Sequence, residues 1–122
     1  MNVEQFFFDV VNQNRDALVN YFNDDALIYW HVSNEVFNVN EYIKVNCDYP
    51  GEWIGEIETV ENTPDGYVLA ARVYSPDKSQ NYHVVSFVKV KDEKIFRLDE
   101  YWSTDEDSPS WRKQMQIGKK IR

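Results

Sequence analysis

The sequence predicts an α+β domain in which an N-terminal helix and a short second helix pack into the hollow of a curved antiparallel sheet. Three observations predict it. Apolar residues recur at helical spacing at the start of the chain, a later segment carries a helix-capping sequence, and four further segments are rich in β-branched and aromatic residues. The 122 residues match the usual size of one domain, so we expect a single domain over residues 1–122.

The first predicted element is an amphipathic helix over residues 3–22. Asn2 is placed to cap its start, with Gln5 three residues further on. The Asn-Asp-Asp sequence at residues 23–25 favours a turn and is expected to end the helix, because such side chains compete for backbone hydrogen bonds. The apolar residues at helical spacing are Val3, Phe7, Val10, Val11, Leu18, Tyr21 and Phe22.

A strand and a second helix are predicted next. Residues 26–32 alternate as in a strand, with Trp30 near its end. Asn38 followed by Glu41 has the form of a capping box, in which each side chain bonds the other's backbone N–H, and this predicts a short helix. The Pro-Gly sequence at residues 50–51 is expected to stop regular structure after that helix.

The rest of the chain is predicted to be strands joined by tight turns. Short connections between consecutive strands require them to run antiparallel, so these segments are expected to form a meander. The turn sequences are Pro64-Asp65-Gly66, Ser75-Pro76-Asp77 and Asp92-Glu93. The predicted strands span residues 53–60, 67–74, 82–90 and 95–102.

The last part of the chain is expected to form a C-terminal arm over residues 104–122. Its first half is acidic and polar, and its second half is rich in lysine and arginine. Trp111 and Ile117 are the apolar residues expected to anchor it, either on its own domain or on a neighbouring molecule.

Charge and cysteine content limit the classes of partner. The formal net charge of −8 repels a phosphate backbone, so nucleic-acid binding is not expected. Cys47 is the only cysteine, which excludes a disulfide within the chain and favours a reducing compartment. No apolar run approaches the roughly 20 residues that span a bilayer, and we expect a cytoplasmic protein without membrane contact.

Glu100 is the leading candidate for acid/base chemistry. Alternation in the last strand places it on the same face as Phe96, Leu98 and Trp102, a largely apolar row. A carboxylate among apolar neighbours resists ionisation, which is how enzymes make general acids and bases. The alternative is structural, with Glu100 pairing with an arginine or accepting a hydrogen bond from a tryptophan ring. Asp99, on the opposite face, is expected to be solvated or paired with Arg97.

Other polar residues are interpreted as structural. His31 and His83 lie in predicted strands without a convincing partner in sequence, so hydrogen-bonded or subunit-contact roles are favoured over catalysis. Cys47 is more typical of a small buried hydrophobe than of a nucleophile. No residues fall at metal-ligand spacing, and phosphate-binding and dinucleotide-binding motifs are absent, so we expect neither a metal nor a cofactor.

The aromatic residues, 16% of the chain, predict a pocket. Trp30, Trp53 and Trp102 each lie near a strand end, where a curved sheet opens, although ordinary core packing would also place them there. An apolar cavity with an aromatic rim and one or two polar groups is typical of a site for a small organic ligand. Tyr42 and Ser86 are the polar residues expected to contact such a ligand.

Several motifs resemble the nuclear transport factor 2-like (NTF2-like) superfamily, and within it the SnoaL-like branch of small single-domain proteins. The resemblance spans essentially the whole chain. The motifs that carry it are residues 26–30 (ALIYW), 47–53 (CDYPGEW), 83–87 (HVVSF), 99–102 (DEYW), 109–112 (PSWR) and 117–118 (IG).

This resemblance implies a cystatin-like, cone-shaped α+β barrel with a pocket at its wide end, and a homodimer formed through the outer face of the sheet. Relatives include isomerases, dehydratases, epoxide hydrolases and polyketide cyclases, alongside members without known activity, so the fold does not fix the function. Two hypotheses follow. The chain is an acid/base isomerase, dehydratase or cyclase acting on a small hydrophobic or aromatic substrate through Glu100, or it is a non-catalytic ligand-binding or dimerisation domain.

Overall fold

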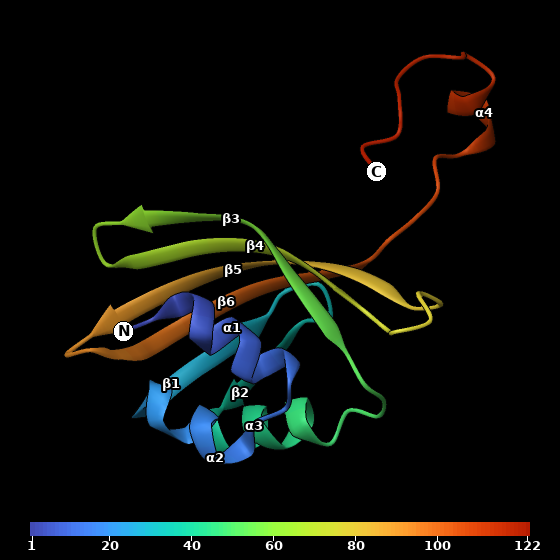
Figure 1. The fold of residues 1–122 in the computed structure, drawn as a ribbon. Helices are drawn as coiled ribbons and strands as arrows, with labels where there is room; N and C mark the ends of the chain where they lie inside the picture. The colour runs from blue at the N-terminus through green and yellow to red at the C-terminus, as the bar shows by residue number, and fades with distance from the viewer.

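The computed structural model describes residues 1–122 as one mixed sheet with all helices but the last, α4, on one side (Figure 1). The helices are α1 (Val3–Val11), α2 (Arg15–Leu18), the 3-10 helix η1 (Val19–Tyr21), α3 (Val39–Cys47) and α4 (Ser110–Lys113). The strands are β1 (Phe22–Trp30), β2 (Glu35–Asn38), β3 (Ile54–Thr63), β4 (Gly66–Tyr74), β5 (Asn81–Lys91) and β6 (Lys94–Thr104).

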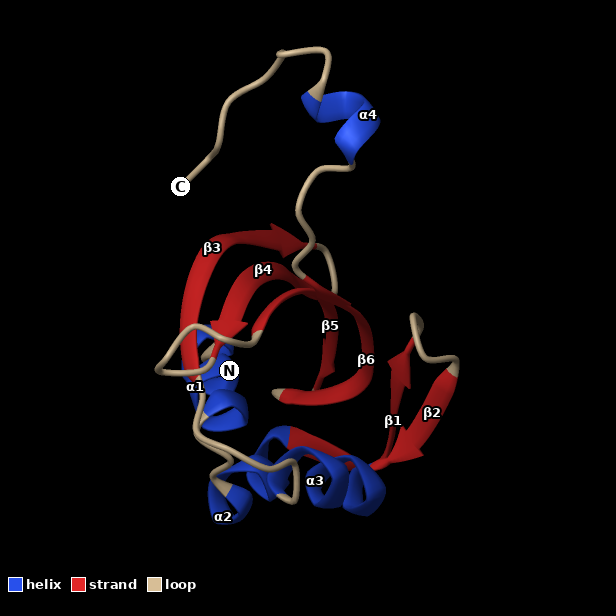
Figure 2. Ribbon diagram, turned by 90° about the vertical axis from the view of Figure 1, so that its right-hand side faces the viewer, coloured by secondary structure: helices blue, strands red, loops and turns tan.

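The six strands lie in the order β2-β1-β6-β5-β4-β3. The predicted antiparallel meander is confirmed for β3 to β6. The prediction of a wholly antiparallel sheet is wrong for one pair, because β1 and β6 run parallel. These two strands are far apart in sequence, so no turn sequence reports their pairing. Since β2 and β3 remain free edges, the sheet does not close into a barrel but bends over α1, α2 and α3 (Figure 2).

Both predicted helix starts are confirmed. The Asn2 side chain accepts a hydrogen bond from the backbone of Gln5, and Asn38 and Glu41 form a complete capping box. The first helix is shorter than predicted, because the chain turns after Val11 with Gln13 at a positive φ of 54° and then forms α2 and η1.

The predicted turn at residues 23–25 is also wrong, since these residues belong to β1. They lie where the β1–β6 register shifts, between the paired positions Phe22 and Leu27, and the Asn23 side chain donates to the backbone oxygens of Lys91 and Lys94. The short strand β2, which the sequence analysis missed, pairs with β1, where Ile28 is the partner of Phe37.

The core lies between the inner face of the sheet and the helices. Leu18, Ile28, Leu98 and Tyr42 are fully buried there. The predicted faces of the last strand are correct from Leu98 onward but wrong before it. The β5–β6 register shifts between Lys89 and Val90, so that Ile95 turns inward with 0% exposure and Phe96 outward with 37%.

The C-terminal arm leaves the end of β6 on the side of the sheet opposite to the helices (Figure 1). Trp111 and Ile117 are 63% and 64% exposed, so within one molecule they do not anchor the arm. Polar contacts tie it to the sheet instead: Arg122 donates to Glu58 at 2.8 Å, and Asp105 lies 2.5 Å from the Nδ1 atom of His83. None of the helices has the length and apolar character needed to cross a bilayer.

Candidate functional site

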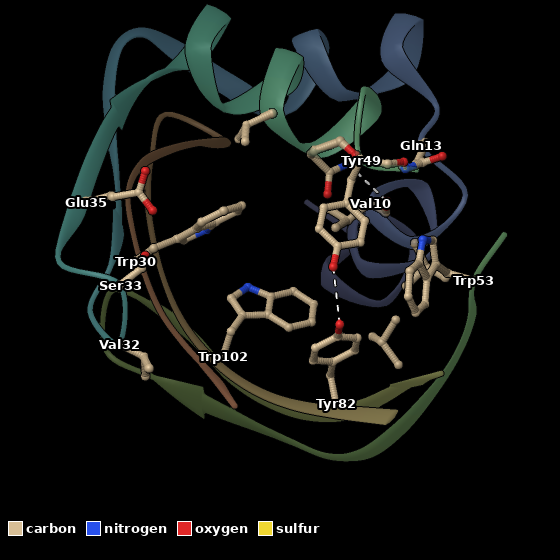
Figure 3. Close-up of a pocket in the computed structure, with 14 residues that line it drawn as sticks. Val10, Gln13, Trp30, Val32, Ser33, Glu35, Tyr49, Trp53, Tyr82 and Trp102 are labelled. Carbon is tan, nitrogen blue, oxygen red and sulfur yellow. Dashed lines mark hydrogen bonds between the residues drawn. The ribbon is translucent and has the colours of Figure 1, made fainter. Parts of the chain in front are cut away.

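A cavity of about 280 Å³ opens between the inner face of the sheet and the helices. Its lining comes from α1, α3, the segment between β1 and β2, the loop before β3, and the ends of β4, β5 and β6 (Figure 3). The lining residues, 10 of which are hydrophobic, are Val10, Val11, Gln13, Trp30, Val32, Ser33, Glu35, Val45, Asn46, Tyr49, Trp53, Val73, Tyr82 and Trp102.

The three tryptophans that the sequence analysis singled out all line this cavity. Trp30 ends β1, Trp53 directly precedes β3, and Trp102 lies near the end of β6. Trp30 and Trp102 meet here because β1 and β6 are neighbours in the sheet, whereas Trp53 comes from the loop before the edge strand β3. Figure 3 shows the rings of Trp30 and Trp102 side by side, facing Tyr49 and Trp53 across the space.

A second aromatic group was missed by the sequence analysis. The hydroxyls of Tyr49 and Tyr82 lie 3.2 Å apart, and both rings contact Trp53, with ring centres at 5.6 and 5.7 Å. The hydrogen bond to Tyr82 raises the pKa of Tyr49 above 10. Tyr49 belongs to the same CDYPGEW segment as Trp53, and its aromatic spacing was the available signal.

The amide N–H groups at the cavity donate to backbone oxygens within the protein. The Gln13 side chain donates to the backbone oxygens of Asn46 and Tyr49, at 3.0 and 2.7 Å, and Asn46 donates to the backbone oxygen of Val10 at 3.0 Å. These bonds join α1 to the end of α3 and the following loop. The cavity therefore offers a ligand mainly aromatic and aliphatic surface.

Glu100 lies behind the indoles and not in the cavity lining. Its Oε1 atom accepts hydrogen bonds from Trp30 Nε1 at 3.1 Å and Trp102 Nε1 at 3.3 Å, and its Oε2 atom accepts one from the Ser86 hydroxyl at 2.5 Å. Sheet register explains these contacts, since Trp30 and Ser86 are the partners of Glu100 in β1 and β5. Trp102 follows two residues later on the same face.

The environment of Glu100 combines two opposing effects on its pKa. Burial, at 3% exposure, raises the pKa, and the hydrogen bonds from Ser86, Trp102 and Trp30 lower it. Burial outweighs the hydrogen bonds, so the pKa lies above its ordinary value of 4.5. All three partners donate, which is the pattern an ionised carboxylate requires. The sequence left two roles open for Glu100, acid/base chemistry or a structural contact. The structure shows the contact expected for the structural role, a hydrogen bond from a tryptophan ring.

Tyr42 and Ser86 also lie beneath the cavity lining. Tyr42 is fully buried, its ring lies edge-on to Trp30, and its hydroxyl has no hydrogen-bond partner. Burial raises the pKa of Tyr42 well above 10, and the nearby Glu100 and Cys47 raise it further. Ser86 borders a second void of only about 10 Å³, together with Glu100 and Trp102. Both predicted ligand contacts therefore fall in the layer that supports the indoles.

The remaining candidates lie outside the cavity. Asp99 points to the outer face, where it accepts from Arg97 at 2.8 Å and lies 2.7 Å from His31 Nε2. His83 is part of the contact with the arm, and Cys47 is half-buried at the end of α3. No group of three or more His, Cys, Asp or Glu side chains is placed to hold a metal ion.

Comparison with known proteins identifies the fold but not a sequence family. Neither a protein-family model nor a curated protein matches the sequence. Solved structures do match, including a ketosteroid isomerase-like protein from Kribbella flavida, with a TM-score of 0.79, 15% identity, and coverage of 98% of this chain and 87% of that one. An NTF2-like protein of unknown function from Burkholderia xenovorans matches with a TM-score of 0.76, 18% identity, and 95% and 92% coverage.

A third structure carries the SnoaL-like description. This polyketide cyclase-like protein from Shewanella putrefaciens matches with a TM-score of 0.70 and 12% identity, over 82% of this chain and 85% of that one. At these identities the likeness establishes the fold alone. The predicted resemblance to the NTF2-like cone, with its SnoaL-like branch, is thereby confirmed as a statement about architecture.

Proposed function

We propose that this chain binds a small, largely apolar organic molecule in the cavity between the sheet and the helices. The observation that carries the proposal is the cavity itself, about 280 Å³ of space with three tryptophans and two tyrosines in its lining. Ligand sites are typically concave and mostly apolar, with few polar groups, and lie near 300 Å³ at the small end of their range. Ketosteroids and polyketides, to which the names of two neighbours refer, are also organic molecules rich in carbon.

The binding proposal is tested by following tryptophan fluorescence while small aromatic and alicyclic compounds are added. A ligand that touches Trp30 and Trp102 should change their emission with saturation. Val45 lines the cavity, so Val45→Phe should fill part of it and weaken binding at least tenfold. Val19 is exposed and outside the lining, and Val19→Phe is the matched control. Saturable binding that survives Val45→Phe unchanged would place the ligand elsewhere and overturn the proposal.

A second candidate is acid/base catalysis by Glu100 on such a ligand, as an isomerase, dehydratase or cyclase. Its buried carboxyl with a raised pKa and the small void beside it favour this role. The void holds no more than about one water, so a substrate would reach Glu100 only if Trp30 or Trp102 moved. Glu100→Gln keeps an oxygen that accepts from the indoles. A catalytic role predicts loss of turnover with ligand binding retained, whereas a purely binding function predicts no turnover in either protein.

We also propose that the chain forms a homodimer through the outer face of the sheet. Leu27, Phe87 and Tyr101 are large, exposed and on adjacent strands of that face. Arg97 and Asp99 lie among them, so the face offers both signs of charge to a second copy. Sedimentation should report a dimer that Phe87→Glu converts to a monomer, and a wild-type monomer at about 100 μM would contradict the proposal. The cytoplasmic location stays a prediction.

A further inference from the structure

We propose that the ligand of the cavity is a methylated ammonium cation, of the kind carried by choline or a betaine ester. This inference rests on the proposed function, since it names the chemical class for the same cavity. It joins three features: the aromatic lining, the absence of a basic side chain from it, and a carboxylate bonded to the back of two of its rings.

The aromatic lining has the composition of an ammonium cage. Trp30, Trp102, Trp53, Tyr49 and Tyr82 surround the space from different strands and loops (Figure 3). The face of an aromatic ring carries negative charge density, which attracts a cation within about 6 Å of the ring centre, most strongly for tryptophan. A quaternary ammonium has no N–H group to donate, so it needs no hydrogen-bond acceptor from the cavity. The side-chain N–H groups of Gln13 and Asn46 already donate to backbone oxygens, which leaves few donors for an anionic ligand.

The lining of the cavity carries a single charge, and it is negative. Glu35 is the only charged residue in the lining, it is exposed at the rim, and its carboxylate takes part in no ion pair. No lysine, arginine or histidine lines the space. The two cations on nearby helices, Arg15 and Lys44, are both paired with Asp48. An anionic ligand would therefore meet no positive side chain here, whereas a cation would meet a net negative field in a chain of charge −8.

Glu100 strengthens this preference from behind the lining. It accepts the N–H groups of both Trp30 and Trp102, so the two indoles are hydrogen-bonded to one carboxylate. Such a bond shifts electron density toward the ring, and the buried carboxylate adds its own potential through a low-dielectric layer. The same bonds fix the orientation of the rings. Glu100 thus acts as a positioning residue that prepares the indoles for a positive charge.

The decisive experiment compares two probes that have the same shape and differ in charge. Choline and 3,3-dimethylbutan-1-ol share their atoms except that carbon replaces the positive nitrogen in the alcohol. We expect isothermal titration calorimetry to show choline binding at least tenfold more tightly than the alcohol. Equal affinity, or preference for the alcohol, would overturn the inference and leave the proposed function standing. If apolar compounds bind in the cavity, as judged with Val45→Phe, but neither choline nor the alcohol binds, the inference is likewise overturned. If no apolar compound binds in the cavity either, the proposed function is overturned as well.

Variants then test where the preference arises. Glu35→Gln and Glu100→Gln each remove one negative charge near the cavity. Each should lower the ratio of choline affinity to alcohol affinity, by a factor on the order of ten for the buried Glu100 and by less for the exposed Glu35. Glu61→Gln removes the same charge from an exposed position in β3 and should leave the ratio unchanged. A ratio that falls equally in Glu61→Gln would assign the preference to overall charge and contradict a role for the cavity. Glu35→Gln keeps this test valid if Glu100→Gln does not fold.

Discussion

Glu100 and Asp99 are neighbouring carboxylates on β6, yet the two faces of the sheet give them opposite properties. Glu100 points inward and is bonded only to neutral donors, Ser86 and two indoles. Asp99 points outward and is bonded to Arg97 and His31. Burial raises the pKa of Glu100 above 4.5. Partial burial alone would raise the pKa of Asp99 too, but the hydrogen bonds from Arg97 and His31 outweigh it and hold that pKa below 3.8.

The comparison shows that sheet register, more than local sequence, decides what a carboxylate does. Trp30 and Tyr29 are consecutive in β1, and they are the register partners of Glu100 and Asp99 respectively. On the inner face, Glu100 therefore lies beside an indole N–H. On the outer face, Asp99 lies beside Tyr29, whose ring lies 4.2 Å from the Arg97 guanidinium. One strand thus carries a buried polar network on its inner face, behind the cavity, and a partly exposed ion-pair cluster on its outer face.

Truncating the two carboxylates should give the largest difference. Glu100→Ala leaves two indole N–H groups and a serine hydroxyl buried without their acceptor, at about 1–3 kcal/mol for each orphaned group, so we expect a loss of about 3 kcal/mol or more. Asp99→Ala breaks contacts whose partners, His31 and Arg97, are 35% and 42% exposed and can be solvated, and it should cost about 1 kcal/mol or less. Urea unfolding monitored by circular dichroism measures both. Equal losses would show that Glu100 is not held in a buried network.

Removing a single donor should give an intermediate effect. Ser86→Ala deletes the hydroxyl that bonds Glu100 Oε2 and should destabilise the protein by about 1–3 kcal/mol at neutral pH, because a buried carboxylate oxygen loses its partner. The pKa of Glu100 should rise further, since that bond lowers it. Ser103→Ala, at an exposed position of the same sheet, is the matched control. If the two serine variants lose the same small amount, the Ser86 bond does not stabilise the ionised form.

Much of this architecture could be predicted from the sequence, because it depends on local signals. The two capped helix starts and the β3-to-β6 meander follow from capping residues, turn residues and period-two alternation. The parallel β1–β6 pair could not be predicted, since it depends on which distant strand becomes a neighbour. The short β2 has only four residues, and the inward turn of Ile95 follows a register shift in the β5–β6 pair that strict alternation does not reveal.

The candidate site divides in the same way. Face alternation was enough to single out Glu100 and Trp102, whereas the hydrogen bonds from Trp30 and Ser86 exist only because β1 and β5 flank β6. Tyr82 and Gln13 were missed as cavity residues because each looks ordinary within its own segment. They reach the cavity through the bend of the sheet and the turn after α1.

The pH dependence of stability should have opposite signs for the two carboxylates. Because its pKa is raised, Glu100 contributes to the free energy of unfolding fully below pH 4.5, and this contribution is lost as pH rises through the folded-state pKa. Gln does not titrate, so the stability of Glu100→Gln relative to wild type should increase as pH rises above about 4.5. The contribution of Asp99 is present above 3.8 and is lost as pH falls through its lowered pKa, so the deficit of Asp99→Asn should shrink in acid. Each unit of pKa shift corresponds to about 1.4 kcal/mol. Urea titrations at several pH values test both signs, and parallel curves for the two variants would contradict the assignment.

The smallest expected effect concerns Tyr42, which lies in the same buried layer as Glu100 but differs from it in having no hydrogen-bond partner for its polar group. Tyr42→Phe removes a hydroxyl whose burial is uncompensated and keeps the ring contacts with Trp30 and Phe22, so stability should stay constant or rise by up to about 1 kcal/mol. Thermal unfolding is sensitive enough to detect it. A loss of more than about 1 kcal/mol would mean that the hydroxyl is bonded in solution, and the layer beneath the indoles would then be polar throughout, extending the network of Glu100 toward α3.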